Sequence, residues 1–137
     1  MTMKRILALA LLIALLSCSL AAMAEPQPKA SELIVDRFVY AYALGDGEVK
    51  FTLDITAKKF VDKLGFSYIE LQEKQGSSWE KVKSASNKYA YNSVNYSYSI
   101  SYNGTIGNEY RVYVKYYAED DGVSDTKTTT SSALTAK

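Results

Sequence analysis

The stretch Val49-Lys50-Phe51-Thr52-Leu53-Asp54-Ile55-Thr56 has an apolar residue at every odd position and a polar residue at every even one. This period of two is typical of a β-strand with one buried face, whereas an amphipathic helix shows a period of 3.6. Similar alternation returns in residues 95–102 and again in residues 110–117. These three stretches predict an all-β fold.

Further strands are predicted on both sides of these stretches. We expect seven, near residues 33–43, 48–56, 64–74, 79–85, 88–102, 109–119 and 125–134. Turn-forming residues separate most of them: Gly45-Asp46-Gly47, Gly76-Ser77-Ser78, Asn103-Gly104 and Asp120-Asp121-Gly122. Residues 57–63 fit one helical turn as an alternative. Short strands at this spacing are typical of a seven-stranded antiparallel β-sandwich, here a single domain over residues 32–137.

Residues 1–24 have the organisation of a secretory signal peptide. A basic start precedes the apolar run 6–16, and eleven residues are too few for a membrane-spanning helix, which needs about 20. The small residues of Ala22-Met23-Ala24 suit cleavage, which would leave residues 25–31 as a short polar tether. We therefore expect a secreted, extracellular protein.

A second interpretation of the leader stays open. Leu15-Leu16-Ser17-Cys18 resembles a bacterial lipobox, in which Cys18 would be lipidated and would anchor the protein to the cell surface. Contact with a membrane is expected only in that case.

The composition excludes several kinds of chemistry. The chain has no histidine, and its one cysteine lies in the leader, so a Ser-His-Asp triad, a Cys-His pair and a zinc site with nitrogen or sulfur ligands are excluded. Without Lys4 and Arg5 the 16 basic residues fall to 14 against 15 acidic ones, with no basic stripe for nucleic acid. We expect no cofactor and no nucleic-acid partner.

Two groups of carboxylates are candidate sites. Residues 119–122 with Asp125 offer oxygen ligands for calcium, but their spacing matches no EF-hand, and we interpret them as an acidic turn without a metal. The carboxylates of Asp54, Glu70, Glu80 and Asp121 leave a small hydrolase as the least favoured function, because they are scattered over polar positions.

The second half of the chain resembles a known type of domain. The relevant stretches are Tyr110-Arg111-Val112-Tyr113-Val114, Tyr116-Tyr117-Ala118, Gly122-Val123-Ser124, and Leu71-Gln72 through Gly76, Trp79, Val82, Lys83 and Ser84. They resemble fibronectin type III and related immunoglobulin-like domains, as found in a family of small secreted bacterial proteins. The resemblance implies that Tyr110 is a corner tyrosine whose hydroxyl bonds nearby backbone, and that strands 64–74 and 109–119 are neighbours.

The candidate site follows from parity on those two strands. If Ile69, Leu71, Val112 and Val114 face the core, the alternate residues point outward. They are Phe66, Tyr68, Glu70 and Gln72 on one strand and Arg111, Tyr113, Lys115 and Tyr117 on the other, and the candidate site residues among them are Phe66, Tyr68, Arg111, Tyr113 and Tyr117. Aromatic rings stack on sugars and anchor protein interfaces. The alternative is that tyrosine simply favours half-buried sheet surfaces, without any ligand.

The sequence thus predicts an exported, non-enzymatic binding or adhesion module that recognises an extracellular protein or a carbohydrate through these residues. A structural or self-associating component of the cell envelope is the alternative.

Overall fold

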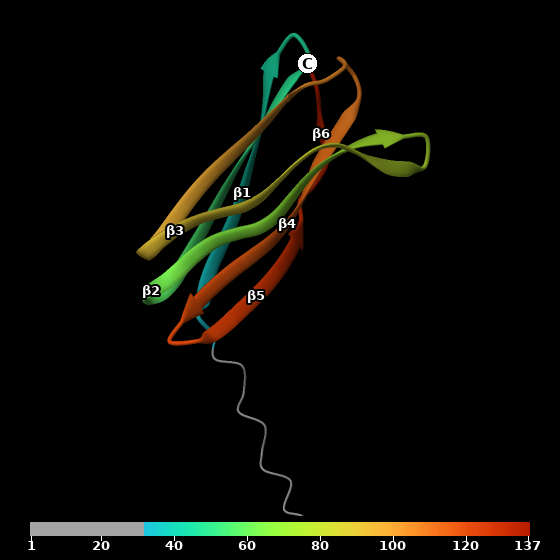
Figure 1. The fold of residues 1–137 in the computed structure, drawn as a ribbon. Helices are drawn as coiled ribbons and strands as arrows, with labels where there is room; N and C mark the ends of the chain where they lie inside the picture. The colour runs from blue at the N-terminus through green and yellow to red at the C-terminus, as the bar shows by residue number, and fades with distance from the viewer. Residues whose placement is uncertain (1–31) are drawn as a thin grey trace, which may run out of the picture.

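A computed structural model describes residues 32–137 (Figure 1). Within this range the structure has six strands: β1 (Ile34–Gly45), β2 (Glu48–Gln75), β3 (Ser78–Asn103), β4 (Glu109–Asp120), β5 (Val123–Thr130) and β6 (Leu134–Thr135). Every strand pairing is antiparallel. The expected signal peptide, the tether 25–31 and the lipidation site Cys18 lie outside the described residues. Within residues 32–137, no helix is long and apolar enough to cross a membrane.

Two of the strands are longer than predicted. β2 unites the predicted strands 48–56 and 64–74, and the helical alternative for residues 57–63 is wrong because these residues are extended. β3 unites 79–85 and 88–102. Asn87, at the predicted break, has a left-handed backbone (φ 55°), but its neighbours Ser86 and Lys88 still pair with β2. A turn-favouring residue therefore marks an irregularity in β3 and not its end.

The long strands β2 and β3 take part in two layers. Residues 48–56 of β2 pair with β1 and with residues 95–103 of β3. Residues 61–75 of β2 pair with residues 78–93 of β3, and this second half also pairs with β4, which pairs in turn with β5 and β6. The β2–β3 register is interrupted between Thr56 and Val61, where the chain passes between layers. The fold is therefore antiparallel, curled and sandwich-like (Figure 1).

One buried cluster fills the space between the layers. The alternation in residues 49–56 is confirmed, because the apolar set Val49, Phe51, Leu53 and Ile55 is fully buried. Opposite it, β2 and β4 contribute a second fully buried set: Leu64, Phe66, Ile69, Leu71, Val112, Val114 and Tyr116. Burying a side chain of this size contributes roughly 1.5–3 kcal/mol, so the core stabilises the domain without a disulfide.

Tyr110 lies at the start of β4 with its ring fully buried. Its hydroxyl accepts a hydrogen bond from the backbone N–H of Thr105 at 2.8 Å and donates one to the Glu73 carboxylate. The expected bond to nearby backbone is confirmed. The ring also packs 5.9 Å from that of Tyr102, so Tyr110 joins β4 to both β2 and β3.

The two ends of the described segment are both tied to the sandwich. Asp125, buried in β5, accepts hydrogen bonds from the backbone N–H groups of Leu33 and Ile34, each at 2.9 Å. At the other end of the chain, the Lys137 carbonyl accepts a bond from the Gly47 N–H at 2.9 Å. Figure 1 shows the two ends at opposite ends of the molecule's long axis.

Candidate functional site

Four of the five predicted site residues lie on one outer surface. The expected pairing of residues 64–74 with 109–119 is confirmed, with Gln72 opposite Arg111, Glu70 opposite Tyr113 and Tyr68 opposite Lys115. We define the β2–β4 face as Tyr68, Glu70, Gln72, Arg111, Tyr113 and Tyr117, which are all half-buried. Parity on two paired strands therefore identified most of this surface.

Phe66 is not part of this face, so its predicted outward orientation is wrong. Phe66 pairs with Tyr116 of β4, and Tyr68 pairs with Lys115, the residue directly before Tyr116. Ser67 therefore has no partner on β4 and forms a β-bulge. The extra residue reverses parity, and Phe66 turns inward. Its ring lies 5.5 Å from that of Tyr116 and 5.8 Å from that of Tyr96.

A chain of hydrogen bonds crosses the β2–β4 face. The Glu70 carboxylate accepts bonds from the Tyr68 hydroxyl at 2.7 Å and from the Gln72 amide at 2.5 Å. The Gln72 carbonyl accepts a bond from Arg111 Nε at 2.7 Å, and the Arg111 guanidinium lies 4.2 Å from the Trp79 ring centroid. These contacts connect the polar side chains of the face to one another, which favours a surface that is ordered without a ligand.

The same hydrogen bonds shift two ionisation equilibria. Bonds from Gln72 and then from Tyr68 lower the pKa of Glu70 below its ordinary value. The bond to Glu70 raises the pKa of Tyr68. Glu70 is therefore an acceptor at neutral pH and Tyr68 is a donor, which suits a surface that reads hydroxyl or amide groups.

An aromatic pair lies at one end of the face, over Gly65. This glycine pairs with Tyr89 of β3 on one side and with Tyr117 of β4 on the other. The two rings approach edge-on at 5.8 Å, with Lys63 Nζ 4.2 Å from the Tyr89 ring centroid. The Tyr117 hydroxyl donates a hydrogen bond to Glu119, and this bond raises the pKa of Tyr117.

Sequence reasoning missed the roles of Lys63, Tyr89 and Trp79 in this surface. Gly65 was the available signal, because a glycine inside a strand often marks a place where another segment of the backbone comes close. A Cβ at this position would lie 2.0 Å from the backbone oxygen of Lys88. Trp79 gave no such signal, because its contact with Arg111 depends on how β3 folds back along β2.

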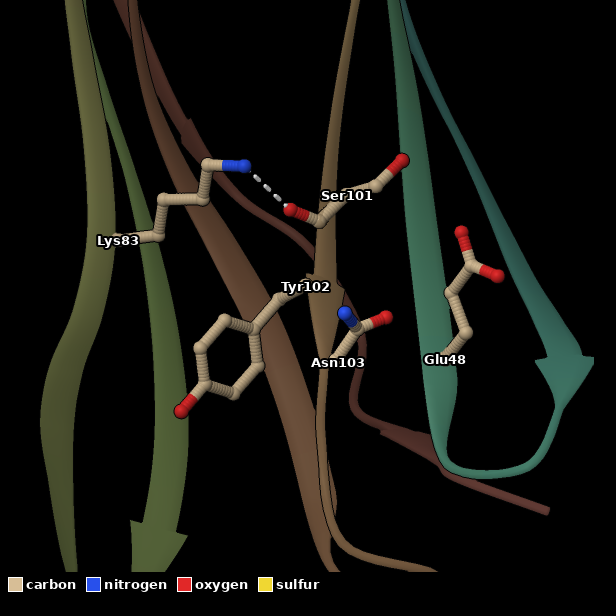
Figure 2. A pocket seen from close by; sticks show the side chains of 5 residues that line it. All are labelled: Glu48, Lys83, Ser101, Tyr102 and Asn103. Carbon is tan, nitrogen blue, oxygen red and sulfur yellow. Dashed lines mark hydrogen bonds between the residues drawn. The ribbon is translucent and has the colours of Figure 1, made fainter.

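A shallow pocket lies elsewhere, between the two halves of β3. It has a volume of about 380 Å³ and is lined by Glu48, Lys83, Ser101, Tyr102 and Asn103 (Figure 2). Lys83 reaches across it, and its Nζ donates a hydrogen bond to the Ser101 carbonyl at 2.7 Å. One of the three donors of the ammonium group is used in this bond, so the pocket offers a small polar ligand the remaining donors of Lys83 beside Glu48 and Asn103.

The acidic turn expected at residues 119–122 is present between β4 and β5, and Asp62 of β2 lies beside it. The carboxylates of Asp62, Asp120 and Asp121 lie within 4.8 Å of one another, whereas Asp125 is buried against the start of β1. Asp125 therefore lies apart from residues 119–122, which form the end of β4 and the turn that leads into β5. Lys59 Nζ lies 2.5 Å from Asp120, and the Asp121 N–H donates to Asp62, so the chain itself partly balances this charge.

In comparisons with known proteins, no family model matches the chain and no curated protein is significantly similar to it.

Proposed function

We propose that this protein is an exported, non-enzymatic binding or adhesion module that recognises an extracellular protein or glycan through the β2–β4 face. The observation that carries the proposal is the shared outer position of Tyr68, Arg111, Tyr113 and Tyr117 around a hydrogen-bonded centre at Glu70 and Gln72.

The chemistry of the face suits such a ligand. Aromatic rings supply a large contact area at little cost in rotamer entropy, and they stack on the apolar faces of sugars. Glu70 lies opposite Tyr113, and Gln72 and Arg111 form the next rung of the same face, so an acceptor and donors lie next to the rings. Because these groups already hold one another, a ligand would have to order few side chains on binding.

We further propose that the domain is of the immunoglobulin-like, fibronectin type III kind. The strand order of the two layers supports this. In one layer, residues 48–56 of β2 pair with β1 on one side and with residues 95–103 of β3 on the other. In the other layer, residues 61–75 of β2 pair with residues 78–93 of β3 and with β4, which pairs in turn with β5. The buried Tyr110 at the start of β4, bonded to backbone five residues upstream, is what a corner tyrosine does. Domains of this architecture commonly serve recognition at cell surfaces, although fold alone does not fix function.

The test is a binding screen followed by one substitution. The exported protein is screened on arrays of glycans and extracellular proteins, and the strongest binder is titrated against wild type and Tyr113→Ala. We expect Tyr113→Ala to weaken binding by about 2 kcal/mol or more, close to 30-fold, while its stability falls far less.

Tyr42→Ala is the matched control, because Tyr42 is a tyrosine on the outer surface of the other layer. It should leave that binding unchanged. A large loss of stability in Tyr113→Ala with unchanged binding per folded molecule would show that Tyr113 is a structural residue, and the proposed face would then be wrong.

A second candidate function is a structural or self-associating component of the cell envelope. The exposed apolar edge of β1 favours it.

A further inference from the structure

β1 lies at the edge of the sheet and exposes a row of large apolar side chains. Its only ladder partner among the described strands is β2. The row consists of Phe38, Tyr40, Tyr42 and Leu44, with exposed fractions of 52, 45, 47 and 53%. The rings of Phe38 and Tyr40 stack with their centroids 6.2 Å apart. We call these four residues the β1 row.

This edge lacks the features by which proteins usually prevent strand addition. Edge strands are commonly protected by lysine, by proline, by inward-pointing charges or by bulges. Residues 38–45 contain no charge and no proline, and the one register shift in this stretch lies at its end, between Ala43 and Gly45. A strand of this kind offers unpaired N–H and C=O groups beside apolar side chains.

The edges of the other layer differ in this respect. Its edge at the first half of β3 carries Lys81, Lys83 and Lys88, and β5 carries Lys127 among threonine and serine residues. Desolvating these charges would oppose the addition of another strand. The opposite edge of β1's own layer, residues 95–103 of β3, is uncharged as well, but its outer side chains are asparagine and serine and Lys83 bonds the Ser101 carbonyl there. Among these edges β1 combines a lack of charge with apolar outer side chains, so it is the better edge for adding a strand.

We propose that β1 pairs antiparallel with β1 of a second copy of this chain, so that the layer containing β1 continues across a twofold axis. Asp36 and Arg37 are the two charged residues of β1, and both lie near its start. Antiparallel pairing places them at opposite ends of the contact, whereas parallel pairing would place like charges side by side. The whole chain has a formal net charge of +1, so two copies repel each other only weakly.

In one register of this pairing, every aromatic ring of the β1 row lies opposite another aromatic ring. With the axis at Tyr40, this residue meets its own copy and Phe38 meets Tyr42 of the other chain, on the same face of the joined sheet. Moving the axis one residue earlier sets Asp36 opposite Tyr42, and moving it one residue later sets Phe38 opposite Leu44. Aromatic cross-strand pairs stabilise sheets, so the register centred on Tyr40 is preferred.

This inference does not depend on the proposed ligand site. The β2–β4 face belongs to the other layer, and the pairing of β1 leaves it free on both copies. Loss of ligand binding in Tyr113→Ala should therefore leave association intact, and loss of association should leave the intrinsic affinity of one face intact.

The first test measures association by sedimentation of the protein in the form recovered from its host, over a range of concentrations. Wild type should show a dimer, and Tyr40→Lys should raise the dissociation constant at least about 100-fold, because two lysines would face each other at the axis. Ser99→Lys is the matched control, because Ser99 is exposed and lies at the opposite edge of the same layer. Tyr40 pairs with Thr52 and Thr52 pairs with Ser99, so the two substituted positions are in the same rung of the sheet. It should dimerise like wild type.

The second test uses disulfide formation to locate the axis. Tyr40→Cys should cross-link two copies on mild oxidation, since directly opposed Cβ atoms lie about 4.5–5.5 Å apart in antiparallel pairs. Ser99→Cys should not, and any cross-link through Cys18 would occur in both variants. A monomeric wild type, a dimer that persists in folded Tyr40→Lys, or equal cross-linking in both cysteine variants would overturn the proposal.

Discussion

β1 and β4 are both strands of 12 residues rich in aromatic side chains, but their surroundings differ. β4 is paired on both sides, and its inward tyrosines Tyr110 and Tyr116 are fully buried. β1 is paired on one side, and Tyr40 and Tyr42 are about half exposed. Position in the sheet, and not residue type, decides whether a tyrosine serves the core, a prearranged surface or an open edge.

The hydroxyl groups divide in the same way. On β4, Tyr110 and Tyr117 bond to carboxylates, whereas the buried Tyr116 hydroxyl has no hydrogen-bond partner. On β1, the hydroxyls of Tyr40 and Tyr42 make no hydrogen bond to any described residue and lie open to water. Substitutions of the buried Tyr110 and Tyr116 should therefore act on stability, and substitutions of Tyr40 and Tyr42 should act on association.

The largest contrast is expected from removing a ring. Tyr116→Ala should destabilise the domain by about 3–5 kcal/mol, because it removes a fully buried ring and leaves a cavity beside Phe66. Tyr42→Ala should cost far less, about 0.5 kcal/mol in dilute solution, since about half of this side chain is exposed and its removal leaves no cavity in the core. Denaturant unfolding of both variants at low concentration measures this difference. Similar losses in the two variants would contradict the comparison.

A smaller effect is expected at alkaline pH. Burial raises the pKa of Tyr116 to about 12, although the nearby Arg37 charge acts in the opposite direction. The folded state therefore keeps this proton above pH 10, where the unfolded chain releases it. The corresponding stability is complete below pH 10 and is lost as the pH rises to 12, by about 2 kcal/mol.

Tyr116→Phe isolates this contribution from the other groups that titrate in the same range. Unfolding free energies measured from pH 8 to 12 should fall more steeply in wild type than in the variant. Parallel curves would show that Tyr116 is ionised as easily in the folded chain as in the unfolded one.

The smallest expected difference in stability is between removal of the Tyr110 hydroxyl and removal of the Tyr116 hydroxyl. Tyr110→Phe should cost about 1–2 kcal/mol at neutral pH, because the Thr105 N–H and Glu73 would each lose a bond. Tyr116→Phe should be neutral or stabilising by up to about 1 kcal/mol, since it removes a buried hydroxyl that has no partner. Denaturation midpoints of the two variants decide this, and an unchanged midpoint for Tyr110→Phe would argue against its role as a corner tyrosine.

The sequence predicted the fold best where one face of a strand is buried and the other is exposed. In residues 49–56 and 110–115 each inward residue is apolar, so alternation identifies both faces. It predicted strand ends less well, because Asn87 lies inside a continuous β3 and residues 57–63 are extended between two layers. Their extended form depends on pairing with distant residues, which a local pattern does not report.

The candidate site shows the same limit. Parity placed Tyr68, Arg111, Tyr113 and Tyr117 correctly on the outer face but failed at Phe66, because the bulge at Ser67 leaves no mark in the composition. The β1 row was missed because the sequence there shows no clear alternation. Residues 41–44 are apolar on both faces, which hid the alternation there and with it the exposed edge.

The bonds of Asp125 to the start of β1 have a mechanical consequence. Because the two ends of the described segment lie at opposite ends of the long axis, tension between them would act along the strands (Figure 1). The bonds from Leu33 and Ile34 to Asp125 would then carry load before the β1–β2 ladder is stretched. Bonds pulled along the strand direction must break together and not one after another. A domain held at its N-terminal end against a moving partner would thus resist unravelling from that end.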